Sequence, residues 1–133
     1  MKCFVDTSAF YALEDPDDHN HDAAAGIQGG MAAGKPELYT TNHVIDECVT
    51  LIGSRMGVQR AIRFARDVLS SRLMMIVRSD EQLEESALAL YERFSDARLS
   101  SAAMRPAGIR IAFSFDRHFE RAGFGLARTL AER

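Results

Sequence analysis

Three acidic residues stand where carboxylates could share a metal ion. Asp6 and Asp116 each directly follow a short apolar run, at residues 2–5 and 112–115, and Glu47 lies in a segment with helical periodicity. Carboxylates that converge without basic partners repel one another and raise one another's pKa unless a cation neutralises them. Oxygen ligands with room for water suit Mg²⁺ or Mn²⁺. The three acids together therefore predict a divalent-metal site.

Each acid alone also has a purely structural interpretation. An Asp after a strand is often a turn former or a helix cap, which applies to Asp6 and Asp116. A Glu beside an apolar helix face is commonly a solvated edge residue, which applies to Glu47. Spacing alone leaves both interpretations open.

The elements that must position these acids follow from hydrophobic periodicity. Four apolar runs predict strands at residues 2–5, 38–41, 73–77 and 112–115. The run 73–77 is the clearest candidate for a buried strand, with Met74 and Met75 as core residues. Helical spacing marks residues 9–13, 21–33, 42–52, 58–69, 83–94 and 100–104. Alternating strands and helices predict an α/β fold with a mostly parallel sheet of four or five strands flanked by helices.

In a parallel sheet the carboxyl ends of the strands face one edge, where open α/β folds place ligands. This geometry brings Asp6 and Asp116 to the same edge. On the helix after the second strand, Val44 and Cys48 define the inner stripe. Glu47 is expected beside that buried stripe, whereas Asp46, also on this helix, is expected to point further outward.

Length and composition restrict the class of protein. A chain of 133 residues with 47% hydrophobic and 26% charged residues is typical of one soluble globular domain. Its net charge of −3 gives no support for diffuse attraction to nucleic acid. Two cysteines suit a reducing cytosol, and no apolar run approaches the ~20 residues that span a bilayer. We therefore expect a cytoplasmic protein with no membrane partner.

The remaining polar and thiol side chains indicate structure rather than chemistry. His19, His21 and Asp22 resemble a metal-ligand cluster, but they lie in a loop with no further ligand nearby, which favours a solvated loop. Cys3 lies in a strand and Cys48 on an inward helix stripe, so both are expected to be core thiols.

Three blocks of the sequence occur together in an informative order. They read VDTSAF at residues 5–10, TNHVIDE at 41–47 and FSFDRHF at 113–119, the last followed by AGF at 122–124. Together they resemble the PIN-domain ribonucleases and, more narrowly, the VapC-type toxins of bacterial toxin–antitoxin pairs. The resemblance runs from residue 1 to about residue 124.

This resemblance implies a three-layer PIN-like fold, as a single domain over residues 1–133. It implies an endoribonuclease toxin that hydrolyses single-stranded RNA with Mg²⁺ or Mn²⁺, is neutralised by a cognate antitoxin and forms homodimers. Asp6, Glu47 and Asp116 match the family's catalytic, metal-binding acids. Thr7 or Ser8 would orient Asp6 or a metal-bound water. The metal would activate water and neutralise charge on the phosphate.

The sequence departs from the family pattern at one place. Family members have a fourth acid in a helix that opens a few residues after a Leu-Ser pair, but here Leu99-Ser100 leads at once to a short helix. The domain is therefore expected to be shortened around residues 95–105. Asp96 either replaces the missing ligand or is an ordinary loop residue. The alternative function is a catalytically impaired relic that binds antitoxin or RNA.

Three further residues lie beside Asp116. Arg117 and Arg121 flank the expected acidic cleft and are candidates for contact with the RNA backbone, with solvated surface arginines as the equal alternative. His118 could reach a phosphate, or its ring could pack on Phe119 instead.

Overall fold

Five parallel strands form the central sheet in the computed structural model, which describes residues 1–93 and 99–127. The strand order is β3-β2-β1-β4-β5 and every neighbouring pair is parallel. This confirms the predicted α/β fold with a parallel sheet. The sheet includes a short fifth strand that the four apolar runs did not mark. The strands are β1 (Lys2–Val5), β2 (Glu37–Thr41), β3 (Met74–Val77), β4 (Ile111–Phe113) and β5 (Gly125–Leu126).

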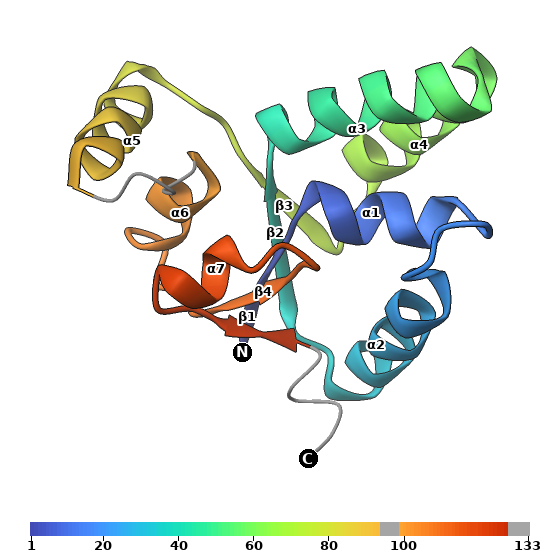
Figure 1. The fold of residues 1–133 in the computed structure, drawn as a ribbon, viewed down its shortest axis with the longest axis horizontal. Helices are drawn as coiled ribbons and strands as arrows, with labels where there is room; N and C mark the ends of the chain where they lie inside the picture. The colour runs from blue at the N-terminus through green and yellow to red at the C-terminus, as the bar shows by residue number, and fades with distance from the viewer. Residues whose placement is uncertain (94–98, 128–133) are drawn as a thin grey trace.

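Helices cover both faces of this sheet, because parallel strands need crossover connections. In Figure 1, α1 to α4 lie to the right of and above the sheet, and α5 and α6 lie to its left. The molecule therefore has three layers. The helices are α1 (Thr7–Glu14), α2 (His21–Gly34), α3 (Asn42–Met56), α4 (Val58–Ser70), α5 (Glu81–Arg93), α6 (Leu99–Met104) and α7 (His118–Arg121). In the described ranges, no helix has both the length and the apolar character needed to cross a bilayer.

The polar edge of the sheet lies where β1 and its neighbour β4 end. Strand β1 runs between β2 and β4, and Cys3, Phe4 and Val5 are all buried. Val5 pairs in register with Phe113 of β4. Both strands end at this level, so the residues that follow them emerge side by side at one edge of the sheet.

The outer strand β3 corrects one prediction. The run 73–77 was expected to be the clearest buried strand with Met75 in the core, but Met75 is 57% exposed and Leu73 is 79% exposed. The physical reason is position: β3 is the edge strand and pairs only with β2 among the described strands. Met74 is half-buried against the core, so the expectation holds better for Met74 than for Met75.

The two cysteines confirm their assignment as core thiols. Cys3 and Cys48 are both free and fully buried. Burial is the largest cause that raises the pKa of each thiol to about 12. A thiol with so high a pKa stays protonated near neutrality, and this leaves neither cysteine suited to act as a nucleophile.

Candidate active site

Asp6 lies at the junction of β1 and α1. Its backbone is extended, its amide donates to the Phe113 carbonyl at 3.1 Å, and its own carbonyl accepts the first helical amides, from Ala9 and Phe10. The residue is therefore the N-cap of α1 by backbone geometry. Its carboxylate makes no capping hydrogen bond. The helix-cap interpretation of this side chain is thus wrong, and the carboxylate is available for other contacts.

A chain of hydroxyl groups holds the Asp6 carboxylate. The Ser114 hydroxyl donates to Asp6 Oδ2 at 3.0 Å, and the Ser8 and Ser114 hydroxyls are 3.1 Å apart. The Phe115 amide donates to Ser8 Oγ at 2.9 Å. Because Ser114 gives its one proton to Asp6, Ser8 must be the donor between the two serines. The proton direction therefore runs from Ser8 through Ser114 to Asp6.

Asp116 is tied to the same serine by its backbone. Its amide donates to Ser114 Oγ at 3.0 Å, so one hydroxyl group contacts both Asp6 and Asp116. Its side chain is 49% exposed, and its Oδ1 accepts from the His118 amide at 3.1 Å. Asp6 and Asp116 thus meet at the carboxyl edge of the sheet, at the ends of β1 and β4, as the spacing predicts.

The electrostatics of Asp6 reflect this setting. Burial is the largest influence and raises the pKa of its carboxyl, while the Thr7 amide, the Ser114 hydroxyl and His118 lower it. The charge of Asp116 raises the pKa further, and the balance is upward. A desolvated carboxylate beside a second one gains stability from a nearby cation.

Glu47 lies on α3, which begins where Thr41 Oγ1 accepts a hydrogen bond from the Val44 amide at 3.1 Å. The Glu47 side chain is exposed, as is Asp46, and both line a shallow depression along α3. Glu47 and Asp6 both add to the raised pKa of the Cys48 thiol, after burial as the main cause. Asp6, after β1, and Glu47, on α3, therefore influence the same buried thiol.

Comparison with known proteins identifies the fold family. The PIN domain family model matches residues 3–125. The chain belongs to the PIN-domain family. Over 131 residues this PIN domain is 37% identical to the 23S rRNA-specific endonuclease VapC20 of Mycobacterium tuberculosis, covering 91% of this chain and 94% of VapC20. The resemblance to VapC-type toxins is confirmed.

Further relatives agree at lower similarity. A VapC ribonuclease of Archaeoglobus fulgidus is 27% identical over 95 residues, which cover 69% of this PIN domain and 58% of that protein. The crystal structure of VapC20, described as a sarcin–ricin-loop-cleaving toxin, superposes with a TM-score of 0.79 and 32% identity over 92% of this chain and 95% of that chain. A Pyrobaculum aerophilum structure matches at a TM-score of 0.62 and 20% identity, covering all of this chain and 94% of that chain. The last likeness concerns the fold alone.

The donor set of this PIN domain fits a hard divalent cation. Asp6 and Asp116 offer carboxylate oxygens at one edge of the sheet, which is the chemistry that Mg²⁺ and Mn²⁺ prefer. The Ser114 hydroxyl contacts both the Asp6 carboxylate and the Asp116 backbone amide, and burial partly desolvates the Asp6 carboxylate. Within residues 1–93 and 99–127, no three His, Cys, Asp or Glu side chains are already arranged as a metal cluster.

The other predicted site residues have different surroundings. The Thr7 side chain is buried, whereas Ser8 reaches Asp6 through Ser114. Asp96 lies outside the described residues. Arg117 and Arg121 are exposed at the start and end of α7. The loop expected for His21 and Asp22 is wrong, because both begin α2, where His21 Nδ1 lies 2.7 Å from the Ala12 carbonyl and links α2 to α1.

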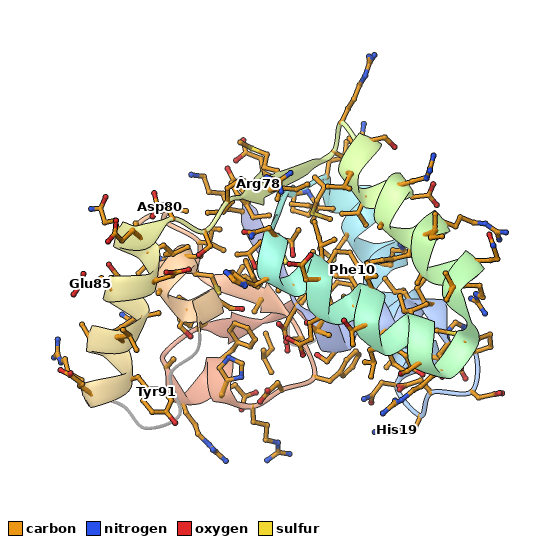
Figure 2. The ribbon with its side chains drawn as sticks, turned by 90° about the horizontal axis from the view of Figure 1, so that it is seen from above. Phe10, His19, Arg78, Asp80, Glu85 and Tyr91 are labelled. Carbon is orange, nitrogen blue, oxygen red and sulfur yellow. The ribbon has the colours of Figure 1, made fainter. Side chains whose placement is uncertain are left out.

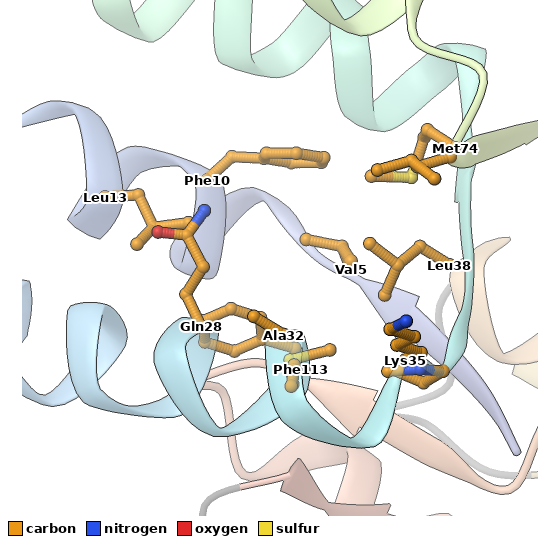
Figure 3. A pocket seen from close by; sticks show the side chains of 12 residues that line it. Val5, Phe10, Leu13, Gln28, Ala32, Lys35, Leu38, Met74 and Phe113 are labelled. Carbon is orange, nitrogen blue, oxygen red and sulfur yellow. The ribbon is translucent and has the colours of Figure 1, made fainter.

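A separate cavity of about 610 Å³ lies between the sheet and helices α1 and α2. Figure 3 shows Phe10 of α1 and Met74 of β3 directed into the same space from opposite sides. None of the predicted acids lines it, and Lys35 is its one charged lining residue among those described. This hollow is an apolar feature of the PIN domain, apart from the carboxylate site.

Sequence reasoning missed Ser114 and left His118 undecided. Ser114 was treated only as part of an apolar strand, but β4 ends at Phe113 and the hydroxyl turns toward Asp6. A lone polar residue between two Phe residues, directly before an acid, was the available signal. The His118 ring packs on Phe119 with centroids 4.0 Å apart, as one of the two interpretations predicts.

Proposed function

We propose that this PIN domain is a divalent-metal-dependent endoribonuclease that hydrolyses single-stranded RNA and acts as a toxin. The observation that carries the proposal is the pairing of Asp6 and Asp116 through one Ser114 hydroxyl at the carboxyl edge of the sheet. The similarity to VapC20, named as an rRNA endonuclease, supports the same chemistry for this chain.

In this proposal Asp6, Glu47 and Asp116 are the catalytic acids and hold Mg²⁺ or Mn²⁺. When bound, such a cation lowers the pKa of a coordinated water and neutralises charge on the phosphate. Asp6 and Asp116, which follow β1 and β4, would hold the cation together with Glu47 of α3. Asp96 is a candidate fourth ligand, which Asp96→Asn in the cleavage assay tests.

The surrounding residues orient the acids. Ser8 fixes the proton direction of Ser114, and this keeps the Ser114 donor pointed at Asp6 Oδ2. The other oxygen of the Asp6 carboxylate makes no hydrogen bond to Ser114 and would be available to the cation. Thr7 supports Asp6 through its backbone amide, which lowers the pKa of the Asp6 carboxyl.

Arg117 and Arg121 are proposed contacts for the RNA backbone. Arg117 is the N-cap of α7 and Arg121 its last residue, so the two are four residues apart along this short helix, which begins two residues after Asp116. Guanidinium groups bind phosphate oxygens in forked geometry and position a strand without reading its bases. Their replacement should weaken RNA binding and reduce its salt dependence.

The direct test is RNA cleavage with and without Mn²⁺ by the wild type and Asp6→Asn. The substrates are an RNA hairpin that carries the sarcin–ricin loop and an unrelated single-stranded RNA. We expect metal-dependent cleavage by the wild type and a loss of at least about 100-fold in Asp6→Asn, since even outer-shell changes cost about 10–100-fold. Asp17→Asn, on the exposed loop after α1, is the matched control. Equal cleavage by wild type and Asp6→Asn would refute the proposal.

The proposal includes a cognate antitoxin, a homodimer and a cytoplasmic location. Support for a dimer comes from α5, which has no buried side chain and exposes Leu88 and Tyr91. Figure 2 shows α5 on the flank of the molecule with Glu85 directed away from the sheet. Light scattering of wild type and Leu88→Glu tests whether this helix forms a dimer interface.

The alternative function, a catalytically impaired PIN domain that binds antitoxin or RNA without cleavage, is not favoured. This alternative depends on the shortening expected around residues 95–105, and residues 94–98 lie outside the described residues. VapC20 and the Archaeoglobus fulgidus relative are named as ribonucleases, and Ser114 contacts both Asp6 and Asp116 in this chain.

A further inference from the structure

His118 contacts the Asp116 carboxylate with two of its own atoms. Its backbone amide donates to Oδ1 at 3.1 Å, and its ring Nδ1 lies 2.9 Å from Oδ2. The ring nitrogen is not directed at Oδ2 well enough for a hydrogen bond, so the second contact is a close polar one. The Asp116 side chain is 49% exposed, so its orientation depends on contacts of this kind. His118 restricts both of its oxygens.

The hydrophobic core anchors the His118 ring. The side chain is only 5% exposed and stacks on Phe119, whose ring centroid is 4.0 Å away. Phe119 is fully buried and packs on Phe4 of β1 at 6.2 Å and on Phe124 at 6.4 Å. A rigid aromatic stack therefore connects the centre of the sheet to the Asp116 carboxylate.

Packing alone does not explain an imidazole at this position. Neither ring nitrogen of His118 makes a hydrogen bond to any described residue, although both are buried. Buried polar atoms without partners cost stability, and a Phe ring would stack on Phe119 without that cost. Unlike a Phe ring, the imidazole places a nitrogen atom beside the Asp116 carboxylate. Its effect reaches Asp6 as well, whose pKa it lowers against the stronger effect of burial.

We propose that His118 is a positioning residue that fixes the orientation in which Asp116 meets a divalent cation, through ring Nδ1 beside Oδ2. The inference rests on the proposed function, because it assigns His118 to the same acidic site. His118 acts through Asp116 and has no direct role with the RNA or the cation.

The test measures Mn²⁺ affinity by titration calorimetry and stability by urea denaturation in each variant. His118→Phe keeps the stack and removes the polar edge, so we expect the Mn²⁺ Kd to rise about 10–100-fold, the usual effect of losing a residue that orients a ligand. Its stability should be unchanged or higher. His118→Asn places an amide nitrogen near the position of Nδ1, so it should recover affinity while losing stability with the stack. His19→Phe is the matched control, since His19 is exposed at the periphery, as Figure 2 shows.

Several outcomes would overturn the inference. Wild-type Mn²⁺ affinity in His118→Phe would show that the imidazole has no positioning role. If His118→Phe and His118→Asn lose Mn²⁺ affinity in proportion to their loss of stability, His118 contributes through packing alone. If His118→Phe does not fold, equal affinities of His118→Asn and His118→Leu would refute the inference. A wild type that binds no Mn²⁺ would refute the proposed function itself, so the two failures are distinguishable.

Discussion

Two regions one residue apart along the same strands have opposite character. Val5 and Phe113 pair in register and line the apolar cavity of about 610 Å³. The next residues along each strand, Asp6 and Ser114, share a hydrogen bond at the carboxyl edge. A single step along the backbone therefore changes an apolar wall into a polar site.

The cavity and the carboxyl edge differ in the kind of interaction that their side chains make. The cavity is roomy, but its side chains interact by packing, which is non-directional and tolerates change. The carboxyl edge instead holds a desolvated carboxylate, a second acid and hydrogen bonds of fixed direction. A carboxyl with a raised pKa in a directional hydrogen-bond network is therefore a better indication of a functional site than a large volume.

The largest expected effect is on stability, at the wall of the cavity. Phe10 reaches the cavity and packs edge-on against Phe64 of α4, with ring centroids 5.3 Å apart. Phe10→Ala should lower the free energy of unfolding by about 3–5 kcal/mol, as truncation of a buried aromatic ring does. Urea denaturation measures this loss. RNA cleavage per folded molecule should stay at the wild-type level, and a specific loss of cleavage would break the distinction between the two regions.

A smaller effect, this time on activity, is expected at Ser114. Ser114→Ala removes the hydroxyl that contacts Asp6 and Asp116, and should reduce metal-dependent cleavage about 10–100-fold, or about 1.4–2.7 kcal/mol. Ser114→Thr keeps the hydroxyl and should restore most of the rate. Steady-state cleavage by both variants, with their stabilities measured in parallel, checks this. Full activity in the Ala variant would show that the shared hydroxyl is dispensable.

The smallest effect is on the pH dependence of stability without metal. Because the pKa of Asp6 is raised in the folded protein above its ordinary value of 3.8, the folded state holds this proton more tightly than the unfolded chain. Stability from this group is fully present below pH 3.8 and decreases as pH rises through the raised pKa. Asp6→Asn should remove that decrease. Urea denaturation in EDTA at a series of pH values measures it, with Asp17→Asn as the control; identical profiles for wild type and Asp6→Asn would contradict it.

The sequence by itself determined the class of fold and the two acids that meet. Alternating apolar runs and helical periodicity predicted the parallel α/β sheet, since burial on both faces requires such runs. Asp6 and Asp116 could be assigned to one edge because parallel strands share their carboxyl ends. The blocks around Asp6, Glu47 and Asp116 also sufficed to identify the PIN-domain family.

Only the tertiary structure decided which side chains contact these acids and which runs are exposed. Ser114 and Asp6 are 108 residues apart in sequence, and no local pattern specifies the direction of a hydrogen bond across that separation. The exposure of β3 likewise depends on its place at the edge of the sheet, because periodicity reports apolar character and not the number of neighbours. Local sequence determines secondary structure and strand ends, whereas contacts between distant segments determine burial, hydrogen-bond direction and pKa.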